Sequence, residues 1–162
     1  MSAAAKTLAI EQLRTDEGLR LVAYPDPKTN GAPWTIGYGH CGMGIHPGLR
    51  WNEAQAEAQL VADVEHVCAE LDRLIPWWSS LAVPRAAVLI NMAFNLGAAG
   101  LMGFKNMLRH ARRGEFEQAA LAMLWNAPGV PTDWAKDVGA RAARLAEQMR
   151  TGVAPPAAQL AV

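Results

Sequence analysis

The apolar segment from Pro84 to Leu96 constrains the fold more than any other part of the chain. Its sequence, PRAAVLINMAFNL, has almost no polar face, and Gly97 follows it. Proline at the start and glycine just past the end are typical of helix boundaries. A helix that is apolar on all sides belongs in the middle of a core. The segment therefore predicts a central helix around which the rest of the protein packs.

The length and composition favour a globular protein. At 162 residues, the chain suits one compact domain or two small lobes that share a linker helix. Hydrophobic residues make up 51% of the chain and charged residues 19%, which is not the composition of a disordered protein. Fifteen basic and fifteen acidic residues leave no net charge. The balance gives no global reason to expect binding to nucleic acid.

The first thirteen residues, MSAAAKTLAIEQL, lack the long apolar run of a signal peptide or a membrane anchor. We therefore expect the chain to be made and held in the cytoplasm, without stable insertion into the membrane. Cys41 and Cys68 would stay reduced there. Neither has the spacing of a metal motif, so both are predicted to be buried small apolar residues.

Hydrophobic spacing predicts a mostly helical chain with one short β segment. A first helix is expected over about 4–16, ended by Gly18. Glycines and prolines crowd residues 22–50 around β-favouring pieces such as WTIGY, which is hairpin composition. Asn52 and Gln55 then form a capping-box pattern. The apolar spacing behind it predicts a helix over 53–74, about 33 Å long and able to join two lobes.

The C-terminal half continues the helical pattern. Further helices are predicted over about 104–112, 115–125 and 134–150, and the tail 153–162 is expected to be frayed. Four basic residues lie close together in sequence here, three in the first of these helices and one just after it: Lys105, Arg109, Arg112 and Arg113. Bases at this spacing share one helix face. Two interpretations stay open, a solvated surface or attraction to an anionic polymer such as a cell wall.

The candidate catalytic residues are concentrated in residues 16–42, DEGLRLVAYPDPKTNGAPWTIGYGHCG. Glu17 lies where the first helix stops, Asp26 lies in a proline-flanked turn, and Thr35 follows on a predicted strand. Glycoside hydrolysis needs two carboxylates on opposite sides of a cleft. Two acids nine residues apart are common, however. Spacing alone also allows structural roles, as a helix-end charge for Glu17 and an Asx-turn residue for Asp26.

The sequence of this segment resembles the signature of the phage-type lysozymes, glycoside hydrolase family 24. The family pattern is a glutamate, eight residues, an aspartate, a short loop and a threonine that opens TIGYGH. Glu17, Asp26 and Thr35 match those positions in order. The segment AAVLINMAFNLGAAGLMGFKNML is similar to the family's central helix and its successor, and Arg141 falls at the spacing of the last helix. The resemblance covers about residues 8–152.

The resemblance implies an α+β fold that is mostly α, the lysozyme-like fold of two lobes. A single catalytic domain would span 1–152. It would contain a small antiparallel sheet lobe over about 18–52, a linker helix over about 53–74, and a helical lobe over about 75–152 that includes the first helix.

The resemblance also implies the activity of an endolysin. Such a muramidase hydrolyses the β-1,4 bond between N-acetylmuramic acid and N-acetylglucosamine in peptidoglycan, with inversion and with no cofactor or metal. Glu17 would be the general acid, Asp26 the general base, and Thr35 would position the attacking water. An inverting enzyme separates its carboxyl groups by roughly 6.5–9.5 Å.

Other positions receive supporting roles from the resemblance. Arg141 would pair with Glu17. His40 has no partner at metal-ligand spacing and would instead form a structural ion pair with Asp63. The remaining matches would contact substrate: Phe94, Asn95, Gly39 and Cys41. Phe94 is equally compatible with a plain core role.

One feature departs from the family pattern. Eight residues, 27–34, separate Asp26 from Thr35, where classic members have five. We expect the longer loop to bulge outward and to change how closely Thr35 approaches Asp26.

The expected partners follow from the same resemblance. Peptidoglycan would be the substrate of a monomeric enzyme that does not bind nucleic acid. The enzyme would wait in the host cytoplasm until a holin releases it to the wall in the periplasm. A lytic transglycosylase and a non-catalytic wall-binding module are the alternatives. A lytic transglycosylase needs no aspartate, so the presence of Asp26 at the family's aspartate position argues against that alternative.

Overall fold

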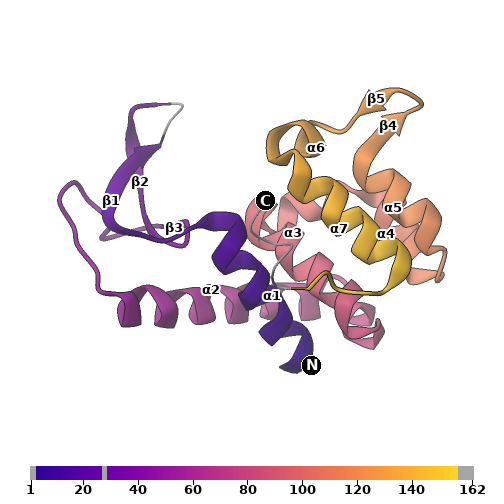
Figure 1. The fold of residues 1–162 in the computed structure, drawn as a ribbon, viewed down its shortest axis with the longest axis horizontal. Helices are drawn as coiled ribbons and strands as arrows, with labels where there is room; N and C mark the ends of the chain where they lie inside the picture. The colour runs from indigo at the N-terminus through magenta and orange to yellow at the C-terminus, as the bar shows by residue number, and fades with distance from the viewer. Residues whose placement is uncertain (1–2, 27–28, 157–162) are drawn as a thin grey trace.

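The computed structural model describes residues 3–26 and 29–156 (Figure 1). Its helices are α1 (Ala3–Glu17), α2 (Glu53–Leu74), the 3-10 helix η1 (Pro76–Ser80), α3 (Val83–Met102), α4 (Lys105–Arg112), α5 (Phe116–Leu124), α6 (Asp133–Val138) and α7 (Ala140–Thr151). Its strands are β1 (Arg20–Asp26), β2 (Gly31–Gly37), β3 (His40–Cys41), β4 (Trp125–Ala127) and β5 (Val130–Pro131). The predicted class, α+β and mostly α, is confirmed.

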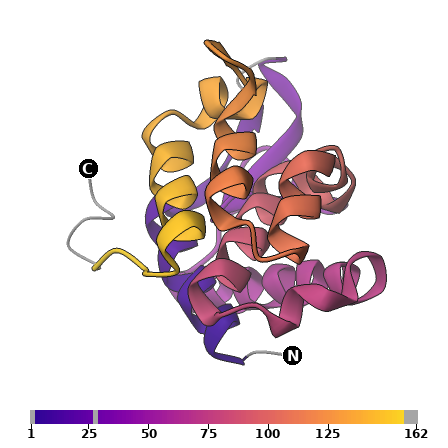
Figure 2. The same cartoon turned by 90° about the vertical axis from the view of Figure 1, so that its right-hand side faces the viewer.

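Helix α3 lies at the centre of the core. Residues 86–93 are all buried, and α1, α2 and α7 all pack against this helix. By length and composition alone, α3 could cross a membrane. Its buried residues instead form the middle of the hydrophobic core, as the apolar segment predicts. Figure 2 shows α4, α5 and α7 stacked beside it.

The helical run around Gly97 differs from its prediction. Gly97 has φ 73° and ψ 157°, which breaks the helix where the sequence predicts its end. The chain then resumes helical geometry as far as Met102. This further turn buries Ala98 and Leu101, so apolar burial extends the helix beyond its glycine.

Helix α2 has the bounds that its sequence predicts. The Asn52 side chain accepts a hydrogen bond from the Gln55 backbone at 2.8 Å, and the Gln55 side chain accepts one from the Asn52 backbone at 2.8 Å. This capping box satisfies backbone donors at the helix start. In Figure 1, α2 runs from below the sheet to the helices at the other end of the molecule.

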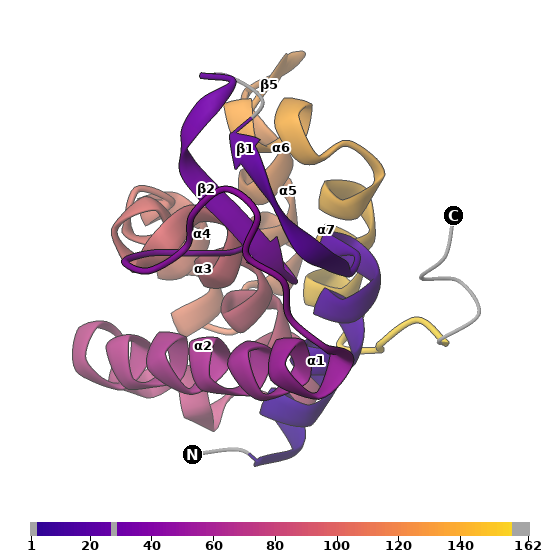
Figure 3. The same ribbon diagram turned by 90° about the vertical axis from the view of Figure 1, so that its left-hand side faces the viewer.

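Strands β1, β2 and β3 form an antiparallel sheet in that order. Figure 3 shows β1 and β2 rising above α2. The segment expected to be a loop over 27–34 is partly strand, because β2 begins at Gly31. Trp34 pairs with Pro25, and Gly31 pairs with Asp26, with an irregularity between them. The extra residues therefore lengthen the hairpin.

The C-terminal region departs from the predicted helices in two places. The single helix expected over 134–150 is two helices, because Gly139 has φ 54° and ψ −121°, a conformation outside the helical region. Strands β4 and β5 form a hairpin between α5 and α6 that the sequence analysis does not predict. Residues 153–156 form no helix or strand, and residues 157–162 of the expected frayed tail lie outside the described residues.

The two cysteines have different environments. Cys68 is buried on α2, as predicted. Cys41 is exposed, so its predicted burial is wrong. It lies on the edge strand β3, which pairs with β2 on one side only.

Candidate active site

Glu17 is the last residue of α1, and Gly18 ends the helix with φ +67°. Arg141 on α7 donates a hydrogen bond from Nη1 to Glu17 Oε1 at 2.8 Å. The Glu17 side chain is 19% exposed and that of Arg141 is 10% exposed. The structure thus brings these two predicted residues together from opposite ends of the chain, with little solvent between them.

Arg141 is held in place by a buried amide. Its Nε and Nη2 atoms donate to Asn91 Oδ1 at 3.0 and 2.8 Å. Asn91 is fully buried on α3 and donates from Nδ2 to Asp16 Oδ2 at 2.9 Å. Arg144, one turn further along α7, donates to the other oxygen of Asp16. These contacts fix the guanidinium, so its orientation toward Glu17 does not depend on that carboxylate alone.

Gly39 lies beside the second carboxylate oxygen of Glu17. A Cβ atom added at Gly39 would lie 3.5 Å from Glu17 Oε2. The residue has φ +86°, in the left-handed region that side chains rarely adopt. The positive φ, and not a lack of space beside the carboxylate, favours glycine in this turn between β2 and β3.

Asp26 ends β1, and its backbone carbonyl accepts a hydrogen bond from the backbone N–H of Asn30 at 2.8 Å. The ladder pairs Thr35 with Tyr24, two residues before Asp26. Burial raises the pKa of Tyr24, the charge of Arg20 lowers it, and the charge of Glu17 raises it. The middle of β1 therefore lies within electrostatic reach of Glu17. The expected separation of the two carboxyl groups stays a prediction.

His40 and Asp63 lie in contact. His40 Nδ1 is 2.9 Å from Asp63 Oδ2, and Gln59 donates to Asp63 Oδ1 at 2.8 Å. The His40 ring lies against Trp51, with 5.7 Å between centroids. In the described ranges, no three histidine, cysteine or acidic residues lie together as a metal site. The contact ties β3 to α2.

A second contact between the sheet and the helices was not predicted. The Tyr38 hydroxyl donates to Glu57 Oε1 at 2.6 Å, and Arg14 donates to Glu57 Oε2 at 2.8 Å. Burial and this hydrogen bond raise the pKa of Tyr38 to about 12. The hydrogen bond from Arg14 lowers the pKa of Glu57. The cluster joins α1, the end of the hairpin, and α2.

The predicted substrate contacts divide into different environments. Phe94 is partly buried and packs against the core, while Asn95 is exposed and accepts a hydrogen bond from Trp134 Nε1 at 3.1 Å. Cys41 is exposed on β3. Gly39, the fourth of these residues, lies beside Glu17.

Sequence reasoning missed Asp16, Asn91 and Arg144, although each carried a signal. Arg144 follows Arg141 by three residues and so shares its helix face. Asn91 is a polar residue within an apolar segment, and a buried amide needs partners. Asp16 adjoins Glu17 in the sequence. Which of these residues meet could not be known before the helices were packed.

The chain is similar in sequence to known phage proteins. Residues 14–146 match the family model described as phage lysozyme. The chain is 32% identical over 121 residues to an endolysin of Bacillus phage B103, covering 74% of this chain and 44% of that protein. It is 30% identical over 166 residues to the pre-baseplate central spike protein Gp5 of Enterobacteria phage T4, covering 88% of this chain and 27% of that protein. The chain thus spans less than half the length of each of these relatives. With a family match over most of its length, the chain belongs to the phage lysozyme family.

Proposed function

We propose that this chain is an endolysin-type muramidase that hydrolyses the β-1,4 bond between N-acetylmuramic acid and N-acetylglucosamine in peptidoglycan. The observation that carries the proposal is the Glu17–Arg141 hydrogen bond of 2.8 Å, supported by the buried Asn91. Glu17 stands in the family register with Asp26 and Thr35. The endolysin relative and the family match support the same activity.

In the proposed reaction, Glu17 gives its proton to the glycosidic oxygen as the bond from that oxygen to the anomeric carbon breaks. A water attacks the anomeric carbon from the opposite face of the sugar and loses a proton to Asp26. Thr35 holds this water by a hydrogen bond. The configuration inverts and one bond is hydrolysed. Asp26 then releases its proton to solvent and Glu17 takes one up, which restores both carboxyl groups to their starting states.

Arg141 has a positioning role in this scheme. Proton donation leaves Glu17 as a carboxylate, and a fixed guanidinium stabilises a negative charge that develops at a known place. Asn91 keeps the guanidinium in that place before the reaction begins, through its two contacts of 3.0 and 2.8 Å. Less reorganisation is then needed when the proton moves.

Mass spectrometry of the products from purified peptidoglycan tests the proposal. Reducing muramic acid ends that have gained one water are expected. Anhydro-muramic ends would identify a lytic transglycosylase instead, because that enzyme uses the sugar's own hydroxyl in place of water. Binding to the wall without any cleavage would identify a non-catalytic module. Either result would overturn the proposal.

We further propose that the enzyme acts as a monomer and is held in the host cytoplasm until a holin opens the inner membrane. A folded polar surface does not cross a bilayer without help, because its groups would lose their hydration. Expression of this chain alone in a Gram-negative cell should leave culture turbidity stable. Chloroform should then cause rapid clearing. Prompt lysis before chloroform would contradict the proposal.

A further inference from the structure

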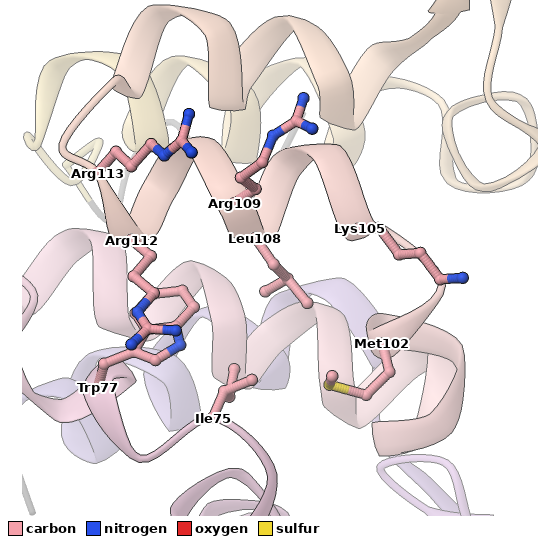
Figure 4. A pocket seen from close by; sticks show the side chains of 8 residues that line it. All are labelled: Ile75, Trp77, Met102, Lys105, Leu108, Arg109, Arg112 and Arg113. Atoms are coloured by element: carbon pink, nitrogen blue, oxygen red, sulfur yellow. The ribbon is translucent and has the colours of Figure 1, made fainter.

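A groove outside the candidate active site combines positive charge with an apolar floor. It has a volume of about 600 Å³ and lies between α4, the end of α3 and the segment that follows α2 (Figure 4). Its lining residues are Ile75, Trp77, Met102, Lys105, Leu108, Arg109, Arg112 and Arg113. We call it the α4 groove.

The rim of the α4 groove is cationic and lacks acidic residues. Lys105, Arg109, Arg112 and Arg113 are all exposed, and none of the lining residues is acidic. Among the described residues, none of these four cations forms an ion pair within 4.0 Å. Nearby Glu115 contacts His110, which lowers the pKa of Glu115, and the charges of Arg113 and Arg109 lower this pKa further. Since no described acidic group lies within 4.0 Å of these four cations, the rim can still receive an anion.

The floor of the α4 groove is made of apolar side chains. Ile75 and Leu108 are buried beneath it, while Trp77 and Met102 remain partly exposed. In Figure 4, Leu108, Met102 and Trp77 lie on one side of α4, and Arg112 extends toward the same side as Trp77. Arg109 and Arg113 extend upward from the helix in this view. A purely polar anion would match the rim and leave this floor in contact with water.

The α4 groove is remote from Glu17. Its floor begins at Ile75, just past the C-terminal end of α2, whereas the sheet contacts α2 through Glu57 and Asp63. Eighteen residues separate Glu57 from Ile75, which corresponds to about 27 Å along a helix. Figure 1 shows the sheet and α4 at opposite sides of the molecule. Occupancy of the groove would leave the candidate active site open.

We propose that the α4 groove binds the phosphate headgroup of an anionic lipid at a membrane surface. The guanidinium groups match the geometry of phosphate oxygens, and the first carbons of an acyl chain would cover Trp77 and Met102. A neutral glycan has no negative charge to match the cationic rim. An anionic polymer without lipid matches only the rim. The proposal does not depend on the hydrolase activity.

Partition into vesicles tests the cationic rim. Vesicles of zwitterionic phosphatidylcholine are compared with vesicles that also contain anionic phosphatidylglycerol. The groove variant is R109Q/R112Q/R113Q, and the control variant is R50Q/K136Q/R150Q, which loses the same charge from exposed positions elsewhere. A cationic side chain near an anionic surface contributes about fivefold in affinity. The groove variant should therefore bind about a hundredfold more weakly to anionic vesicles, and well below the control.

A soluble ligand tests the apolar floor in the unmodified protein. Phosphatidylglycerol with six-carbon chains, kept below its micelle concentration, is compared with glycerophosphoglycerol and with inorganic phosphate. Burial of two methylene groups alone corresponds to about tenfold in affinity. The short-chain lipid should bind at least tenfold more tightly than either chainless anion, and should shift the indole resonance of Trp77.

Three results would overturn the proposal. The first is equal partition of the groove and control variants into anionic vesicles. The second is equal affinity for the short-chain lipid and the chainless anions. The third is retention on lipid-free wall fragments with no binding to anionic vesicles. Thermal unfolding verifies that both variants are folded, and the titration of the unmodified protein decides the matter if one is not.

Discussion

Replacement of Arg141 by methionine removes the guanidinium and keeps much of the side-chain volume. Loss of one partner from a buried ion pair costs about 3–5 kcal/mol in the free energy of unfolding. Two features lower this cost, whereas the buried Asn91 Oδ1, which loses both of its Arg141 donors, raises it, so we expect Arg141→Met to span the full range of about 3–5 kcal/mol. Glu17 is 19% exposed and can be partly hydrated, and Asp16 keeps its contact with Arg144.

Thermal unfolding followed by circular dichroism measures this effect. For a chain of this size, 1 kcal/mol corresponds to about 2–4 °C in Tm, so Arg141→Met should lower Tm by roughly 6–20 °C. Arg150→Gln on the same helix is the matched control. Arg150 pairs with Glu147 at an exposed site, where such pairs contribute about 0–1 kcal/mol. A Tm for Arg141→Met no lower than that of the control would refute the reasoning.

Three further perturbations test local features of the fold. The raised pKa of Tyr38 means that the folded state favours the protonated phenol, so its contribution to stability is complete below pH ~10. This contribution is lost as the pH rises through its folded pKa of about 12. An ultraviolet titration should therefore show one phenol that ionises late in the unmodified protein and is missing in Tyr38→Phe. The same late ionisation in both proteins would contradict this. Asn52→Ala removes the capping box and should cost about 1 kcal/mol in denaturant unfolding, whereas an unchanged midpoint would count against the cap. Gly152→Ala places a Cβ 2.7 Å from Arg85 Nη1 at φ +70°, so it should cost more than about 1 kcal/mol; an unchanged or higher midpoint would refute this.

The sequence predicts the features that are set by local chemistry. Asn52 and Gln55 mark the start of α2 because capping depends on residues three apart, and the apolar segment from Pro84 marks the core helix by its composition. The helix breaks at Gly97 and Gly139 are not set by local chemistry alone. Glycine permits a positive φ without requiring it, and packing of Leu101 beyond the first break decides that the helix resumes.

In the candidate site too, contacts that depend on how the helices pack could not be predicted from the sequence. Glu17, Asp26 and Thr35 were identified by a family pattern, since two acids at that spacing carry little information alone. The partners Asn91 and Asp16 depend on how α1, α3 and α7 pack, and 75 residues separate them in sequence. Cys41 was misjudged because composition does not show which side of an edge strand faces solvent. Strands β4 and β5 are too short for any alternation to appear.

The role of Glu17 as general acid is the central claim. Its most direct test is the rate at which Glu17→Gln lyses cells whose outer membrane has been permeabilised, measured beside its Tm. The amide keeps the shape of the side chain and cannot donate the proton. Loss of a general acid lowers a rate by about 10²–10⁴-fold. The account predicts a folded variant whose lytic rate falls at least a hundredfold, and a folded variant that lyses at nearly the unmodified rate would contradict it.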